Sequence, residues 1–273
     1  MPAGLVFADD LAEAVREAEC VVVAVPSKFF RATTRALAAF QGAVVSVTKG
    51  IEYDSGLTMS AVLRENAPQA FVAALSGPTL APEVARDIPT AIVAAGETAE
   101  VAHEIQRLFH RPAFRVYTST DLLGVELGGA LKNVIAIAAG VCDGLGFGDN
   151  SKAALVTRGV AEIRRLGVAC GAKAETFAGL SGLGDLTVTC FSRLSRNRGF
   201  GERLGRGEKP AHILATSVSV AEGYPTARSA LQLAQRLGVS VPIIETVHAM
   251  AYEDQNAQEA LRGLLSRESK AED

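Results

Sequence analysis

The sequence carries little excess charge and few cysteines, and both features exclude classes of function. The formal net charge of its 273 residues is −3, so the chain has no general electrostatic attraction to nucleic acid or to an anionic membrane. Any anion site must therefore be local. The four cysteines, Cys20, Cys142, Cys170 and Cys190, form no Cys-x-x-Cys pair. Their scatter predicts reduced structural thiols in a reducing compartment, and no metal-ligand set is predicted.

Long hydrophobic runs and a targeting segment are also lacking. The most apolar run, 134–142, is far too short to span a bilayer. The opening residues, MPAGLVFADD, have no basic region and soon turn acidic, unlike a signal peptide. We therefore expect a cytoplasmic protein without a membrane span, long enough for two domains.

The first 120 residues alternate short β-branched runs with helical segments. Strands are expected at 20–25, 43–47, 70–76, 90–96 and 114–119, and helices at 28–40, 57–66, 79–87 and 98–110. Runs such as CVVVAV are typical of strands buried on both faces. Strands separated by short helices favour βαβ units, so the predicted fold class here is α/β with a mostly parallel sheet.

After residue 120 the strand signals almost disappear. Helices are expected at 121–145, 152–170, 224–238 and 243–252, the second ending at Gly171 as helices commonly do. The change predicts a boundary near residue 120, with a partial α/β domain over 1–120 and an all-α domain over 121–273.

Lys132 lies in the otherwise apolar segment ELGGALKNVIAIAAG. Counting in fours, it shares a helix face with Gly124, Gly128, Ala136 and Gly140. The helix alone favours a close helix–helix contact with the lysine reaching out to water. The alternative is a catalytic lysine, because a desolvated ammonium loses pKa and becomes a usable acid or base.

Two short motifs follow predicted strands. In VTKG, Lys49 lies just past a strand end, where ligands of open α/β sheets bind, although this motif alone favours an ordinary loop lysine. In SGPTLAPE, Gly77 and Pro78 are expected to form a turn and Thr79 to cap the next helix. Free N–H groups at that helix start favour an anionic oxygen, and a plain turn and cap is the alternative.

Two further motifs lie in the helical part. In SGLGDLTVTC, Asp185 follows a glycine-rich turn from which it could be held against a lysine. In SRLSRNRG, Arg193, Arg196 and Arg198 alternate with serine and asparagine, a composition that suits a phosphate or, alternatively, a solvated basic loop. Glu222, in SVSVAEGYPT, indicates little by itself.

Together these stretches resemble one family, the bacterial NAD(P)-dependent sn-glycerol-3-phosphate dehydrogenases. VVVAVPS, SVTKGIE, LSGPTLAPEVA, VELGGALKNVIAIAAG, GLSGLGDLTVTC, SRNRGFG and VAEGYPTA occur in the family's order, over about residues 18 to 252. The resemblance implies a Rossmann-like first domain and an all-α second domain. It also implies reversible hydride transfer between NAD(P)H and dihydroxyacetone phosphate, giving sn-glycerol 3-phosphate for glycerophospholipid synthesis.

The resemblance assigns roles residue by residue. Lys132 matches the catalytic proton acceptor, and Asp185 a substrate-site carboxylate suited to orient it. The implied substrate contacts are Lys49, Gly77, Thr79, Lys132, Asp185, Ser195, Arg196 and Asn197. The implied contacts to NAD or NADP are Lys49, Ala81, Arg196, Val220 and Glu222.

The sequence departs from the family at its start. The family opens with a strand and a Gly-x-Gly-x-x-Gly turn that cradles the pyrophosphate, and neither GLGFGD (144–149) nor GLSGLG (179–184) has the strand–turn–helix context of such a turn. At least one βαβ unit of about 30 residues is missing, and with it the residues that select NADP over NAD. The sequence is then either a fragment, or a chain whose start codon is assigned too late. Alternatively, the short chain is real and has lost cofactor binding.

Two other functions stay open. One is a non-catalytic remnant that binds a phosphorylated ligand or dimerises, and a homodimer is kept as a partner hypothesis. The other is a related dehydrogenase of another hydroxy acid, since such two-domain folds host several substrates.

Overall fold

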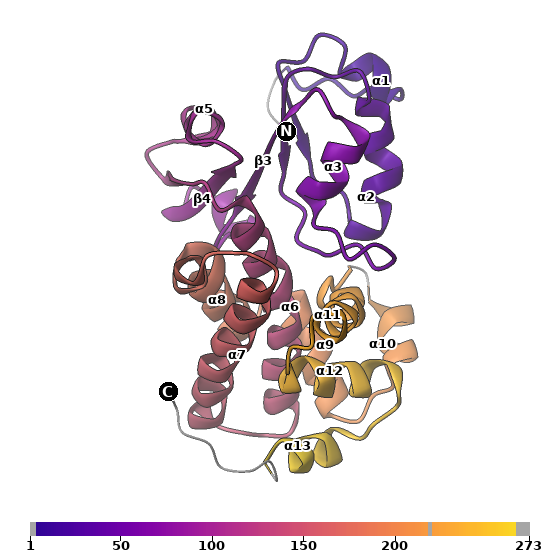
Figure 1. Cartoon of the computed structure of the whole chain (residues 1–273). Coiled ribbons are helices and arrows are strands. Elements are labelled where there is room, and N and C mark those ends of the chain that lie inside the picture. Colours follow the sequence, from indigo (N-terminus) through magenta and orange to yellow (C-terminus); the bar gives the residue numbers. More distant parts are fainter. Residues whose placement is uncertain (1–3, 218–219, 266–273) are drawn as a thin grey trace.

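The computed structural model describes residues 4–217 and 220–265 (Figure 1). The first part contains the elements α1 (Leu11–Ala14), β1 (Cys20–Val23), α2 (Ser27–Thr34), β2 (Ala43–Ser46), α3 (Met59–Asn66), β3 (Phe71–Ser76), α4 (Ala81–Val84), β4 (Thr90–Gly96), α5 (Ala99–Phe109) and β5 (Phe114–Ser119). The second part contains the helices α6 (Leu122–Gly144), α7 (Asp149–Ala169), α8 (Asp185–Phe191), α9 (Arg196–Gly205), α10 (Pro210–Thr216), α11 (Gly223–Leu237), α12 (Pro242–Tyr252) and α13 (Ala257–Leu265). The predicted α/β fold followed by helices is confirmed.

The strands form one five-stranded sheet in the order β1-β2-β3-β4-β5. The pairs β1/β2, β2/β3 and β4/β5 are parallel, whereas β3/β4 is antiparallel. The sheet is therefore mostly parallel, but the succession of βαβ units expected from the sequence breaks after β3. The connection 77–89 contains the four-residue α4, too short to pack across the sheet as a crossover helix.

Helices cover both faces of the sheet. One face packs against α2, α3 and the first turn of α6, through side chains such as Phe30, Met59 and Val125. The other face packs against α5, where Ile105 is fully buried. The segments that follow β1 and β2 face the helical part of the chain, since Ser27 contacts Glu222 and Lys49 contacts Asp185.

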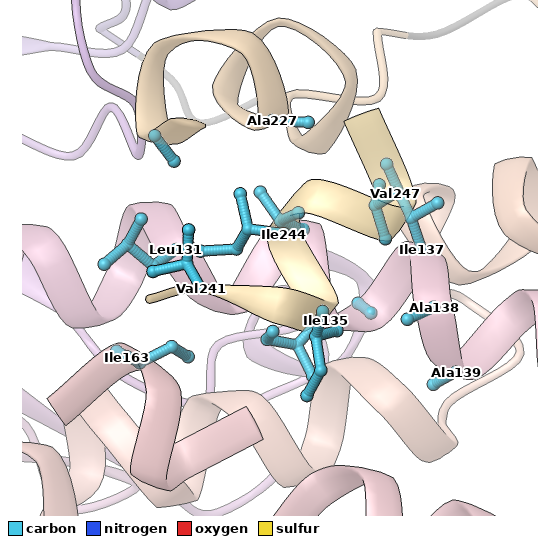
Figure 2. Packing of buried hydrophobic residues seen from close by; sticks show 14 of the residues in the cluster. Leu131, Ile135, Ile137, Ala138, Ala139, Ile163, Ala227, Val241, Ile244 and Val247 are labelled. Carbon is cyan, nitrogen blue, oxygen red and sulfur yellow. The ribbon is translucent and has the colours of Figure 1, made fainter. Parts of the chain in front are cut away.

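Helix α6 is the core of the second part. Residues 124–141 are all buried, and Leu131, Ile135 and Ile137 pack against Val241, Ile244 and Val247 around them (Figure 2). With 23 residues, α6 is long and apolar enough to cross a bilayer, so the run 134–142 understates the helix, but 94% of its apolar window is buried inside the protein. It is thus the core helix of a globular domain.

A buried carboxylate fixes the start of α12. Glu162, on α7, is 2% exposed and accepts hydrogen bonds from the backbone N–H groups of Ile243 at 3.0 Å and Ile244 at 2.8 Å. Burial raises the pKa of Glu162 to about 7, against the lowering effect of these bonds. The side chain replaces the N-cap that Val241 cannot supply.

Replacing Glu162 by alanine is expected to lower the free energy of unfolding by about 2 to 4 kcal/mol, because two buried N–H donors lose their acceptor. Urea unfolding of wild type and variant measures the difference. Glu104→Ala, an exposed acid on α5, is the control and should change stability by less than about 0.5 kcal/mol. A similarly small effect at Glu162 would show that water satisfies the α12 N-terminus.

Candidate active site

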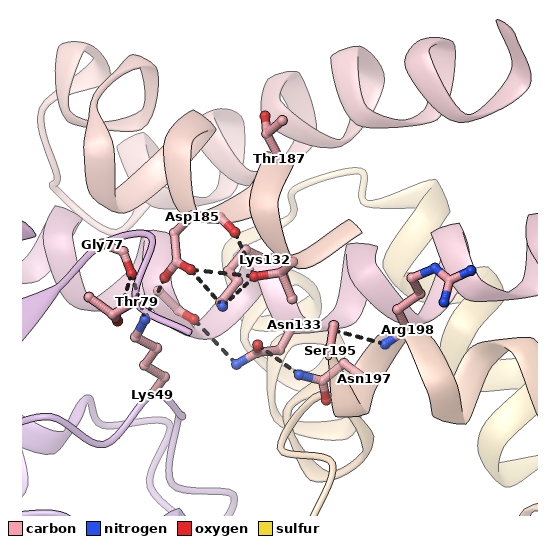
Figure 3. A network of polar contacts seen from close by, with 12 residues as sticks. Lys49, Gly77, Thr79, Lys132, Asn133, Asp185, Thr187, Ser195, Asn197 and Arg198 are labelled. Atoms are coloured by element: carbon pink, nitrogen blue, oxygen red, sulfur yellow. Dashed lines mark hydrogen bonds and ion pairs between the residues drawn. The ribbon is translucent and has the colours of Figure 1, made fainter. Parts of the chain in front are cut away.

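Polar groups from four separate segments, three side chains and the Gly77 carbonyl, meet where the strand ends face α6. Lys49 follows β2, Gly77 follows β3, Lys132 lies in the middle of α6, and Asp185 begins α8 (Figure 3). The strands deliver the first two because parallel strands end at one edge of the sheet. These are the residues that the sequence motifs singled out, and the fold brings them into direct contact.

Lys132 does not reach water. It is 6% exposed, and its Nζ donates to Asp185 Oδ1 at 2.8 Å and to Thr189 Oγ1 at 2.6 Å. Burial, and then the positive charge of Lys49, lower the pKa of Lys132 to about 8, although Asp185 opposes the shift. The interpretation of Lys132 as a lysine extending to solvent is therefore wrong, and the buried ammonium of the alternative is observed.

Asp185 bridges the two lysines. Its Oδ2 accepts from Lys49 Nζ at 2.6 Å, its Oδ1 accepts from Lys132, and the residue is 1% exposed. Burial alone would raise the pKa of the Asp185 carboxyl, but the charges of Lys49 and Lys132 together hold it below its usual value. The group carries one negative charge between two positive ones, so the site has a net positive charge that favours an anionic substrate.

Thr189 is a site residue that the sequence motifs did not indicate. Its hydroxyl donates to the Asp185 carbonyl oxygen at 2.6 Å, which leaves a lone pair to accept from Lys132. Its position four residues after Asp185 on the same helix was the available signal, because such residues share a face.

Gly77 closes the sheet side of the site. Its φ of +152° favours glycine, and a Cβ at position 77 would lie in tight contact with the Ile92 Cα, at 3.1 Å. The Gly77 carbonyl accepts from Lys49 Nζ at 3.0 Å and from the Thr79 hydroxyl at 3.1 Å. The expected helix cap at Thr79 is wrong, because Leu80 is the N-cap of α4 and Thr79 turns back to the strand end.

The SRNR segment forms the start of α9 beside α6. Ser195 is the N-cap and accepts from the Arg198 N–H at 3.2 Å. Arg196 is exposed, with no ion pair among the described residues. Asn197 is buried, donating to Asn133 Oδ1 at 2.8 Å and accepting from the Gly223 N–H at 2.8 Å. Asn133, next to Lys132, was also missed, and its place beside a candidate lysine was the only signal.

Of the residues assigned to the cofactor, Lys49 belongs to this cluster and Arg196 to the SRNR segment, while Glu222, Ala81 and Val220 lie elsewhere. Glu222, just before α11, accepts from the Ser27 hydroxyl at 2.6 Å and its N–H at 3.3 Å, at the turn between β1 and α2. Ala81 and Val220 are exposed. A Cβ on Gly50 would lie 2.6 Å from Ser27 Cβ, so the loops after β1 and β2 approach closely.

This arrangement fits part of a dinucleotide. The carboxyl ends of adjacent parallel strands, together with Glu222 and Lys49, form the kind of edge at which nucleotides bind. The two glycine-rich segments do not add a phosphate-binding turn. Residues 144–149 join α6 to α7, and Leu180–Gly184 is a π-helical turn that leads into α8, so neither follows a strand.

Family comparisons cover both parts of the chain. The family model described as the NAD-dependent glycerol-3-phosphate dehydrogenase N-terminus matches residues 1–102, and the corresponding C-terminus model matches residues 121–262. The glycerol-3-phosphate dehydrogenase (NAD(P)+) of Geobacter sp. (strain M21) is 49% identical over 275 residues, covering 98% of this chain and 82% of the relative. That of Geobacter sulfurreducens is 50% identical with the same coverage.

Solved structures agree with these matches. The glycerol-3-phosphate dehydrogenase of Coxiella burnetii superposes with a TM-score of 0.91 at 35% identity, covering 94% of this chain and 80% of that one. The enzyme of the same name from Saccharomyces cerevisiae gives a TM-score of 0.83 at 26% identity, covering 98% and 81%. The similarity therefore extends over both the sheet and the helical part of the chain.

Proposed function

The chain belongs to the NAD(P)-dependent glycerol-3-phosphate dehydrogenase family, and from this we propose that Lys132 is the proton-transferring group of its reaction. The reaction is the reversible reduction of dihydroxyacetone phosphate to sn-glycerol 3-phosphate, with NAD or NADP as cofactor. The observation that carries the proposal is the Lys49–Asp185–Lys132 bridge at the strand ends. When bound, NAD(P)H supplies the hydride.

The protein's own groups handle the proton and the charge. As the substrate carbonyl is reduced, its oxygen gains negative charge and takes a proton from Lys132 Nζ, and in oxidation the neutral amine takes the hydroxyl proton back. Asp185 orients Lys132 through the 2.8 Å hydrogen bond. Lys49, on the other oxygen of Asp185, adds the positive charge that stabilises the developing oxyanion.

The remaining assigned residues hold the ends of the two ligands. We assign the substrate phosphate to Ser195, Arg196 and Asn197, where an exposed guanidinium stands at the start of a ten-residue helix. Gly77 and Thr79 line the substrate on the sheet side. We assign the cofactor to Lys49, Ala81, Arg196, Val220 and Glu222.

We also propose two domains for the chain and a cytoplasmic location. A boundary near residue 120 is supported by β5 ending at Ser119 and α6 beginning at Leu122, although the first turn of α6 still packs on the sheet. The four free cysteines support a reducing compartment, for which we propose the cytoplasm. A homodimer stays a prediction.

Initial rates of NADH and NADPH oxidation with dihydroxyacetone phosphate test the function. We expect turnover with this substrate and far weaker turnover with dihydroxyacetone or a 2-keto acid. Tight binding of dihydroxyacetone phosphate without turnover would support the non-catalytic alternative, and equal turnover without the phosphate would overturn the substrate assignment. The same assay on a chain extended by a Gly-x-Gly-x-x-Gly βαβ unit separates weak cofactor binding from lost chemistry.

The lowered pKa of Lys132 predicts opposite pH dependences in the two directions. Reduction needs the protonated lysine, so its kcat/KM should fall as pH rises through about 8. Oxidation needs the neutral amine, so its kcat/KM should rise over the same interval. Initial rates in both directions from neutral to alkaline pH measure this. If kcat/KM falls with rising pH in both directions, or rises in both, Lys132 is excluded as the titrating group.

A further inference from the structure

Arg198 is the arginine of the SRNR segment that the proposed function leaves unused. Its side chain is 12% exposed and points away from the Lys132–Asp185 pair (Figure 3). Its Nε forms an ion pair with Asp143 Oδ2 at 2.6 Å, in which the two atoms are not aligned as a hydrogen bond, and its Nη1 lies 3.3 Å from Glu202 Oε2. The sequence grouped Arg198 with Arg196 as a phosphate ligand, but the structure engages it with carboxylates instead.

Asp143 is the centre of a second, largely buried charge cluster. It lies in the last turn of α6, and its side chain is 13% exposed. One of its oxygens pairs with Lys152 of α7, and the other pairs with Arg198 of α9. One carboxylate thus ties two neighbouring helices to the end of the helix that carries Lys132. Removing one member of such a cluster leaves buried charge without compensation.

The packing of α6 against α9 explains why this tie matters. A Cβ on Gly140 would overlap the Arg198 carbonyl oxygen, and a Cβ on Gly201 would overlap the carbonyl oxygen of Ile137. The two helices therefore touch through backbone at these glycines, and Phe200 and Leu204 of α9 are buried in the core around α6. In the first turn of α9, Asn197 contacts Asn133 and Arg198 contacts Asp143, and these two side chains connect that turn to α6.

We propose that Asp143 is a positioning residue for the substrate phosphate: by holding Arg198, it orients the first turn of α9 and leaves Arg196 as the arginine that meets the phosphate. This rests on the proposed function, because it assumes that Arg196 binds that group. Arg196 and Arg198 are two residues apart on one helix, so their side chains point in widely different directions. Engaging one with Asp143 therefore determines where the other points.

Asp143→Asn is the direct test. It removes the charge that holds Arg198, and we expect KM for dihydroxyacetone phosphate to rise about tenfold while kcat changes less than about threefold. The preference for dihydroxyacetone phosphate over dihydroxyacetone should fall with the rise in KM, because only the former carries the phosphate. An equal loss on both substrates would mean general loosening and would overturn the inference.

A double variant isolates the route through Arg196. In an Arg196→Ala background, Asp143→Asn should add no further rise in KM, whereas independent, additive effects would contradict the positioning role. Glu208→Gln is the matched control, since it removes a carboxylate paired with Arg203, an arginine near the other end of α9. Its KM values should equal those of the wild type.

Arg198 variants keep the test available if Asp143→Asn does not fold. Arg198→Lys retains a cation for Asp143 and should raise KM for dihydroxyacetone phosphate less than Arg198→Met does, whereas equal KM values in the two variants would overturn the inference. The wild type separates this inference from the proposed function. If the wild type itself shows no preference for the phosphorylated substrate, the proposed function fails. If it does and Asp143→Asn keeps that preference, the positioning role fails.

Discussion

Lys132→Met is expected to lower kcat in both directions by about a hundredfold to ten-thousandfold, the contribution typical of a positioned general acid or base. Methionine matches the unbranched apolar stem of lysine and lacks only the terminal ammonium, so the packing around α6 is largely preserved. Asp185 keeps Lys49 as a counter-ion at 2.6 Å, and the site therefore does not acquire an unpaired buried charge. KM for dihydroxyacetone phosphate should change much less than kcat. Steady-state rates, measured while dihydroxyacetone phosphate and NAD(P)H are each varied, separate the change in kcat from the change in KM.

Two comparisons separate proton transfer from a structural effect. Glu126→Gln replaces another buried charged residue of α6, one that binds Ser60 at the start of α3, and it should leave kcat near the wild-type value. Lys132→Ala should regain part of its activity when small primary amines are added, because an amine in the vacated space supplies the missing acid. Near-normal turnover of Lys132→Met would show that Lys132 is not the proton-transferring group.

The sequence singled out residues that the fold brings together where a motif combined an unusual residue with an unusual place. Lys132 in an apolar helix and Lys49 past a strand end are both such cases, and α6 and β2 lie close to the predicted ranges. The sheet was also largely predictable, because the period and length of each apolar run identify strands directly.

The contacts that depend on three-dimensional packing were not predictable. Thr189 and Asn133 are ordinary residues on helices, and their roles arise only because α8 and α9 pack against α6. The reversal of β4 depends on a connection whose helix is too short, and α4 was expected to be longer than its four residues. Arg198 looked equivalent to Arg196 in the sequence, since nothing local indicates that Asp143 lies beside it.

Asp185→Asn is expected to have the second large effect, because it removes the one negative charge between two lysines. Asparagine keeps the size of the side chain, yet the ammonium groups of Lys49 and Lys132 then repel each other without compensation. Burial and Lys49 already lower the pKa of Lys132 to about 8, so losing the opposing pull of Asp185 should lower it further. The descending limb of the reduction profile should move to lower pH, and kcat for reduction near neutral pH should fall about a hundredfold.

The movement of the descending limb of the reduction pH profile to lower pH distinguishes Asp185 from a residue that merely supports the fold. Asp121→Asn alters another buried aspartate, which caps α6 and accepts from Thr176, and it should lower stability without moving the pH limb. Adding Lys49→Gln to Asp185→Asn removes the repulsion, so the pKa of Lys132 should recover part of the way. If the reduction rate of Asp185→Asn falls over the same pH interval as that of the wild type, the charge of Asp185 does not set the protonation of Lys132. Partial recovery in the double variant would instead demonstrate that the three charges titrate as one unit, in which Lys49 lowers the pKa of Lys132 and Asp185 opposes that shift.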